Sequence, residues 1–159
     1  MNQAASPLAG IKILDLSQIM AGPYCTMVLA DLGAEVIKVE KTGAGDDSRE
    51  MGPYVNGEST CFAQINRNKQ GIALNLKDPE AREVLYELAR WADVVVENYR
   101  VGVTRSLGVD YETLSRINPR LVYCSISGYG QSGPYAGKGG FDLVAQGMSG
   151  IMSMTCLLY

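Results

Sequence analysis

The stretch that decides the fold is Leu14-Asp15-Leu16-Ser17-Gln18-Ile19-Met20-Ala21-Gly22-Pro23, together with the later Glu35-Val36-Ile37-Lys38-Val39-Glu40. The two segments predict a strand, a loop, a short helix and a second strand that ends on an acidic residue. This order opens many nucleotide-binding α/β domains. The glycine fingerprint of a dinucleotide site is missing from the first loop. We therefore expect an adenine nucleotide to be held by a different arrangement.

The rest of the chain continues the alternation of strands and helices. Further strands are predicted over 72–76, 93–96 and 121–126, and helices over 23–32, 78–92 and 110–117. The helix over 78–92 has the clearest signals, because Asp78 is an N-cap residue and Pro79 suits the first helical position. Residues 48–70 are expected to be irregular, and 147–154 to begin a helix or loop. The pattern predicts an α/β fold, a Rossmann-like parallel sheet with flanking helices.

Composition narrows the class of protein. Hydrophobic residues make up 47% and charged residues 19% of the 159 residues, which is ordinary for a soluble globular protein. The net charge of −3 favours neither nucleic acid nor an anionic membrane as a partner. No apolar run approaches the roughly 20 residues of a membrane span, and no targeting peptide is recognised. We expect a cytoplasmic protein.

The side chains available for chemistry exclude several kinds of site. The sequence has no histidine, so the commonest general base and metal ligand is missing. The four cysteines form no Cys-x-x-Cys pair, and no metal site is expected. Cys25 and Cys124 lie in apolar segments and are interpreted as reduced core residues.

The loops that follow the predicted strands carry glycines, aromatic residues and cations. In an open parallel sheet these loops meet at one edge, where ligands bind. Any one of them resembles an ordinary turn, but four at one edge favour a site for a flat adenine ring and its phosphates. Lys77 and Arg49 are interpreted as solvated surface charges. Glu40 suggests an alternative, the ribose of NAD in an oxidoreductase, which the missing glycine fingerprint disfavours. The cations of these loops are Lys41, Arg100, Arg105 and Lys138.

Several motifs together resemble the family III coenzyme A transferases, the CaiB/BaiF group. They are the stretch 15–23, Ala30-Asp31-Leu32-Gly33-Ala34 continuing into 35–40, Gly43-Ala44-Gly45-Asp46, Asn66-Arg67-Asn68-Lys69, Val96-Glu97-Asn98-Tyr99 and Ser127-Gly128-Tyr129-Gly130. The resemblance extends from Pro7 to Thr155. It implies the Rossmann-like, CoA-binding part of a large domain, and an interlocked homodimer for the full-length family.

The resemblance also implies site residues. The positions that match CoA contacts are Gln18, Ile19, Met20, Ala21, Lys41, Leu74, Lys77, Asn98, Tyr99, Val103, Arg105 and Lys138. Arg105 lies one residue earlier than the arginine of the family, and Ser106 occupies that place. Lys138 aligns only approximately, because the preceding loop varies in length. The implied substrates are an acyl-CoA and a carboxylic acid, with no covalently bound cofactor.

The resemblance implies no catalytic residue within the 159 residues. The family nucleophile is an aspartate that takes the acyl group; it follows the segment matching Ala145–Gly150, and we expect it beyond Tyr159. Asp142 precedes that segment and does not match. We therefore expect residues 1–159 to be an N-terminal part of the domain, incomplete at its C-terminus, and to lack transferase activity alone. The alternative is a non-catalytic CoA-binding or regulatory product. Acyl selectivity depends largely on the missing part.

Overall fold

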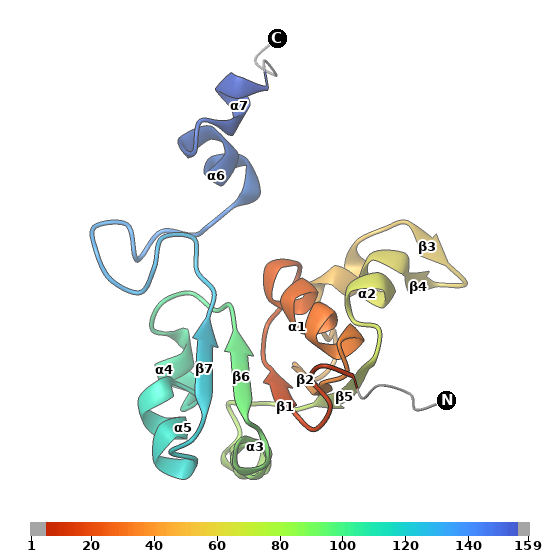
Figure 1. The fold of residues 1–159 in the computed structure, drawn as a ribbon, viewed down its shortest axis with the longest axis vertical. Coiled ribbons are helices and arrows are strands. Elements are labelled where there is room, and N and C mark those ends of the chain that lie inside the picture. Colours follow the sequence, from red (N-terminus) through yellow and green to blue (C-terminus); the bar gives the residue numbers. More distant parts are fainter. Residues whose placement is uncertain (1–5, 156–159) are drawn as a thin grey trace.

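The computed structural model describes residues 6–155 (Figure 1). Its strands are β1 (Lys12–Asp15), β2 (Glu35–Glu40), β3 (Tyr54–Val55), β4 (Glu58–Ser59), β5 (Lys69–Ala73), β6 (Val94–Glu97) and β7 (Val122–Ser125). Its helices are α1 (Ala21–Asp31), α2 (Thr60–Ile65), α3 (Pro79–Trp91), α4 (Val103–Leu107), α5 (Tyr111–Ile117), α6 (Asp142–Met148) and α7 (Ile151–Met154), with a 3-10 turn η1 (Asp47–Glu50).

Five of the strands form one parallel sheet in the order β5-β2-β1-β6-β7. The chain builds one half of the sheet outward from β1 and then returns to the other side of β1 with β6. Ligand crevices of doubly wound sheets lie where the strand order reverses in this way. The predicted α/β fold with a parallel sheet is confirmed.

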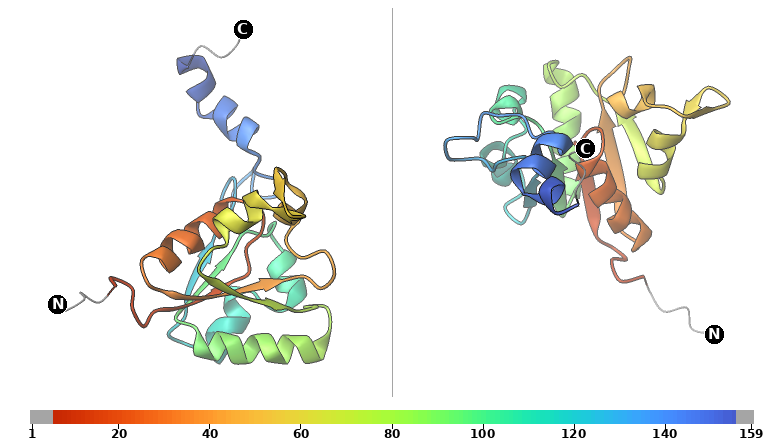
Figure 2. Two further views of the ribbon diagram at one scale, coloured as in Figure 1. Left: turned by 90° about the vertical axis from the view of Figure 1, so that its right-hand side faces the viewer. Right: turned by 90° about the horizontal axis from the view of Figure 1, so that it is seen from above.

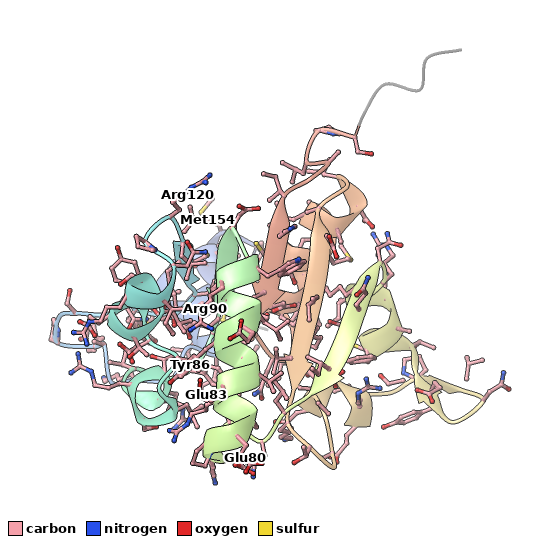
Figure 3. All side chains as sticks on the ribbon, turned by 90° about the horizontal axis from the view of Figure 1, so that it is seen from below. Glu80, Glu83, Tyr86, Arg90, Arg120 and Met154 are labelled. Carbon is pink, nitrogen blue, oxygen red and sulfur yellow. The ribbon has the colours of Figure 1, made fainter. Side chains whose placement is uncertain are left out.

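Helices cover both faces of the sheet. Successive strand residues point to opposite faces, so each strand supplies apolar side chains to both. Ile13 and Val36 pack with the α1 side, where Ala30 is buried. Leu14 and Val95 pack on the other side, against Leu85 of α3. Figures 2 and 3 show α3 lying along this second face.

The ends of α1 illustrate how local sequence sets an element. The helix starts at Ala21, so Pro23 is its third residue and not its first as predicted. Proline is tolerated there because the first-turn N–H groups have no partner within the helix. At the other end, Gly33 has φ of 100° and donates to Ala30 at 2.9 Å, while Ala34 donates to Leu29 at 3.1 Å. This is a Schellman end, which favours glycine.

The prediction for residues 48–70 was wrong. The segment contains η1, the hairpin of β3 and β4, and α2, whose N-cap Ser59 accepts from Phe62 N–H. The third strand of the sheet is β5 over 69–73, not 72–76, and it pairs with β2 from Val36↔Lys69 to Glu40↔Ala73. It is an edge strand, and its first residue, Lys69, is buried against Asp15. Helix α4 was also not predicted; it is five residues long and lies between the left-handed Gly102 and Gly108.

Helices α6 and α7 extend away from the sheet (Figures 1 and 2). Several of their large apolar side chains are exposed, including Leu143, Met148 and Met154. Among residues 6–155, no helix combines the length and the apolar character needed to cross a membrane.

Candidate functional site

A pocket of about 170 Å³ lies where the loop after β1 meets the ends of β2, β5 and β6. Five of the predicted site residues line this pocket, and they come from four separate segments. These are Gln18, Lys41, Leu74, Lys77 and Tyr99. Val39, Glu40, Thr42, Asn75, Leu76 and Leu107 complete the lining. The pocket therefore has an apolar wall, an aromatic ring and two lysines.

Asn98 joins two of the strand-end loops through its side-chain amide. Its Oδ1 accepts from Gln18 N–H at 2.8 Å, and its Nδ2 donates to the Gln18 carbonyl at 2.8 Å. The Gln18 side chain then reaches the hydroxyl of Tyr99 at 3.4 Å. An amide suits this position because it can donate and accept at once. Gln18, Asn98 and Tyr99 thus form one connected unit.

The polar groups of the pocket differ in their charge. Burial raises the pKa of Tyr99, so its phenol is neutral at ordinary pH. A hydrogen bond to Asp47 raises the pKa of Lys41, so Lys41 carries its charge. This contact with Asp47 is on the surface, where ion pairs are weak and exchangeable. Lys41 is therefore a cation for which a phosphate can replace Asp47 as the partner.

Outside the pocket, on the face of the sheet that α1 covers, two lysines are buried with acidic partners. Lys38 pairs with Asp46 at 2.8 Å, and Lys69 pairs with Asp15 at 3.0 Å. Sequence reasoning did not find these pairs. The available signal was Lys38 between the apolar residues Ile37 and Val39 of the strand, since a buried lysine requires a charged or polar partner.

Glu40 and Arg49 form an ion pair beside the loop of residues 41–46. Arg49 donates to the two oxygens of Glu40 at 2.7 and 2.8 Å, and its guanidinium lies 3.6 Å from the ring centre of Phe62. Arg49 is partly exposed, with 39% of its side chain accessible, and does not line the pocket, but these two interactions hold it in place. Glu40, the acid that the NAD alternative would use for a ribose, is occupied by Arg49 and by Asp46 N–H at 2.9 Å.

The family is decided by comparison with known proteins. The family model "CoA-transferase family III" matches residues 8–157. The chain belongs to CoA-transferase family III.

Relatives and solved structures agree with this assignment. A mouse succinyl-CoA:glutarate CoA-transferase is 53% identical over 150 residues, which is 94% of this chain and 34% of the relative. An acetyl-CoA:oxalate CoA-transferase of Acetobacter aceti is 49% identical over 149 residues, 94% of this chain and 38% of the relative. The crystal structure of a CAIB/BAIF family protein from Brucella suis superposes with a TM-score of 0.88 at 45% identity, covering 94% of this chain and 40% of that one. The chain thus spans little more than a third of the length of these relatives.

The other residues that the family III resemblance implies lie outside the pocket. Ile19 and Met20 are exposed on the loop before α1, and Ala21 is the first residue of that helix. Val103 is the first residue of α4. Lys138 lies on the loop before α6, with its ammonium 4.3 Å from the ring centre of Tyr135. The structure does not bring Lys138 to the pocket.

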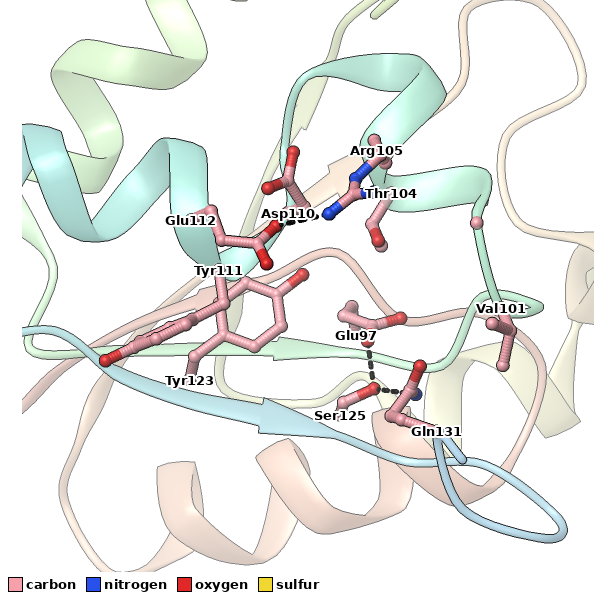
Figure 4. Close-up of a pocket in the computed structure, with 11 residues that line it drawn as sticks. Glu97, Val101, Thr104, Arg105, Asp110, Tyr111, Glu112, Tyr123, Ser125 and Gln131 are labelled. Atoms are coloured by element: carbon pink, nitrogen blue, oxygen red, sulfur yellow. Dashed lines mark hydrogen bonds and ion pairs between the residues drawn. The ribbon is translucent and has the colours of Figure 1, made fainter. Parts of the chain in front are cut away.

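Arg105 lies in a different hollow, of about 640 Å³, between the ends of β6 and β7 and the helices α4 and α5 (Figure 4). Its guanidinium donates to Glu112 at 2.9 Å. Glu97 and Asp110 also line this hollow. The hollow therefore holds three carboxylates against one guanidinium, which already pairs with Glu112, and this balance of charge does not favour a phosphate.

The nucleophilic aspartate that the resemblance implies lies outside the part of the chain that the structure describes. Its expected position is beyond Tyr159, and Tyr159 itself lies outside the described residues, 6–155. The position of the nucleophile therefore stays a prediction. Asp142, the acid that precedes the matching segment, is the first residue of α6, and its carboxylate accepts from the Gln146 amide at 2.6 Å.

Proposed function

We propose that residues 1–159 bind coenzyme A as the N-terminal part of an acyl-CoA:carboxylate CoA-transferase. The observation that carries the proposal is the pocket at the sheet edge, which brings Gln18, Tyr99, Lys41 and Lys77 together with an apolar wall. Its volume of about 170 Å³ resembles that of a protein cavity of about 150 Å³ that accepts benzene. We infer that the pocket takes a flat ring such as part of adenine, with the two lysines supplying charge for phosphates.

The proposed reaction of the whole protein moves CoA from an acyl-CoA to a carboxylic acid. The relatives support this class of reaction, since their names include succinyl-CoA with glutarate and acetyl-CoA with oxalate. The whole protein would act in the cytoplasm as a homodimer, by analogy with the family.

We propose further that the 159-residue chain alone does not catalyse the transfer, because the nucleophile is expected beyond Tyr159. The buried carboxylates near the pocket do not replace it, since other groups engage them. Asp15 pairs with Lys69, Asp46 with Lys38, and Glu40 with Arg49. None of the three is free to attack a thioester.

Calorimetric titration of the chain with CoA tests the binding proposal. We expect saturable binding that weakens by about tenfold or more in Lys41→Ala, because a charge-assisted contact with phosphate is lost. Lys77→Ala should weaken binding in the same direction. Arg120→Ala is the matched control, since Arg120 is an exposed cation just before β7, at the opposite edge of the sheet.

Two outcomes separate the proposal from its alternatives. Equal CoA affinity in Lys41→Ala and Arg120→Ala would remove Lys41 from the site. Incubation with acyl-CoAs and carboxylates, followed by trapping with hydroxylamine, should give no adduct. Turnover with a trapped adduct on any residue up to Tyr159 would overturn the proposed inactivity and point first to Asp142, which is exposed on α6.

A further inference from the structure

Three consecutive residues of the loop after β1, Ser17 to Ile19, are each held through their backbone by a side chain from another part of the fold. The Ser17 carbonyl accepts from Lys38 Nζ at 2.8 Å. Gln18 is held through both its N–H and its carbonyl by Asn98. Ile19 N–H donates to the two oxygens of Asp46, at 3.0 and 3.2 Å. Lys38 and Asp46 therefore contact the residues on either side of Gln18.

Ile19 adopts a conformation that its side chain disfavours. Its φ is 67°, in the left-handed region. The other two non-glycine residues with positive φ among residues 6–155 are asparagines, Asn56 and Asn68. Asparagine tolerates this region, whereas a β-branched residue is an outlier there. Such a conformation persists only where surrounding groups hold it.

The groups that hold Ile19 are buried and mutually satisfied. Lys38 and Asp46 are 2% and 1% exposed and lie 2.8 Å apart. Ser48 donates to Asp46 through its N–H at 2.9 Å and its hydroxyl at 2.8 Å. An apolar pair of similar size often serves stability as well as a buried ion pair does. Stability alone therefore does not account for a buried polar acceptor at this place.

We propose that the Lys38–Asp46 pair is a positioning device for the CoA site, which holds Ile19 left-handed so that the Gln18 side chain lines the pocket. This inference rests on the proposed function, because it concerns the loop at the edge of the proposed CoA pocket. The pair itself does not line the pocket, so its effect on the ligand passes through the backbone of residues 17–19.

Two neutral double variants separate positioning from stability. Lys38→Met with Asp46→Leu removes both charges and the acceptor for Ile19 N–H. Lys38→Met with Asp46→Asn removes the charges but keeps an amide oxygen as acceptor. We expect the first to bind CoA about tenfold more weakly than the parent chain, and the second to stay within about threefold of it. Thermal melts and backbone chemical shifts of Ile19 are recorded for each variant.

Ile19→Gly separates positioning from a merely structural role. The measured quantity is the loss of CoA affinity when the pair is removed, compared between the Ile19→Gly chain and the parent chain. Glycine reaches positive φ without strain, so the loop no longer needs the pair. Removing the pair with the Met/Leu substitutions should therefore cost less CoA affinity in the Ile19→Gly chain than in the parent. An equal cost in both backgrounds would overturn the proposal, as would parent-like affinity of the Met/Leu variant.

The remaining outcomes also support or overturn the proposal. If the Met/Leu variant does not fold, CoA affinity is compared between the Met/Asn variant and Asp46→Asn alone. The proposal predicts that the Met/Asn variant retains its affinity for CoA. A loss of about tenfold or more in the Met/Asn variant overturns the proposal. If the parent chain binds no CoA, the proposed function fails. The Ile19 chemical shifts still test the pair, since left-handed shifts that survive its removal contradict positioning and extended shifts support it.

Discussion

Charged side chains under the strand-end loops are almost completely buried, and their protonation follows from their partners. Burial lowers the pKa of Lys69, and the charge of Asp15 opposes this shift. For Asp46, burial raises the pKa, but hydrogen bonds from Lys38 and Ser48 outweigh it, so the pKa lies below the ordinary value. Asp46 therefore serves as an anion around which loop backbone is arranged. At the scale of single residues, the loop beside the pocket is held by acids that do not line the pocket.

Glu40 gives a pH-dependent prediction. The hydrogen bond from Arg49 is the main cause that lowers the pKa of Glu40 below its ordinary value of 4.5. The folded chain thus binds fewer protons at Glu40 than the unfolded chain just below this pH. The resulting stability is fully present above the unfolded pKa and is lost as pH falls through the folded pKa. Glu40→Gln should reduce the free energy of unfolding near neutral pH and flatten its decline in acid.

Urea unfolding from about pH 7 down to about pH 3 measures this effect. Glu83→Gln is the control, because Glu83 is an exposed carboxylate on α3 (Figure 3). If the two variants show the same dependence on pH, the Glu40–Arg49 pair does not contribute to stability.

At the scale of elements, α3 secures the second face of the sheet. Its side chain Leu85 is fully buried among Leu14, Val95 and Leu114, whereas the adjacent Val84 is exposed. Leu85→Ala should lower the free energy of unfolding by about 2–5 kcal/mol, because it leaves a cavity in the core. Val84→Ala, the matched control, should stay within about 0.5 kcal/mol. Denaturant unfolding measures both, and similar losses would contradict the packing of α3 described above.

The elements also show which parts of the fold can be predicted from sequence. Asp78 and Pro79 predict the start of α3 because capping is local: the Asp78 carboxylate accepts from Glu80 N–H at 3.0 Å. Strand β5 begins with polar residues and is defined by its pairing with β2, so its register is not visible locally. The loop contacts of Asn98 and Asp46 depend on residues 80 and 27 positions away. Such contacts follow from the sheet order, which sequence periodicity does not specify.

The candidate site was predictable to a similar extent. Parallel strands place their carboxyl ends at one edge, so Gln18, Lys41 and Tyr99 could be expected to meet there. The resemblance to family III added Leu74 and Lys77, which also line the pocket. Arg105 could not be separated from this group by sequence, because its direction depends on the short helix α4 between two left-handed glycines. The roles of these residues in CoA binding stay predictions.

At the scale of the whole molecule, two features lie at the edge formed by the carboxyl ends of the parallel strands. This edge carries the proposed CoA pocket, and the chain leaves β7 at this same edge to form α6 and α7 (Figures 1 and 2). Leu143 is 70% and Met148 61% exposed, and Phe141, Ile151 and Met154 add further exposed apolar area. Exposed apolar area of this extent on two short helices favours association.

We therefore expect the 159-residue chain to self-associate through α6 and α7. Light scattering after size-exclusion chromatography should show a mass that rises with concentration, and a dye that binds apolar surface should fluoresce. Leu143→Ser with Met148→Ser should lower both signals, because apolar area is removed from this surface. Val55→Ser is the control, since Val55 is 60% exposed but lies in the hairpin of β3 and β4. A double variant that associates as strongly as the control would show that another surface drives association, and a strictly monomeric parent chain would show that this apolar surface is tolerated in water.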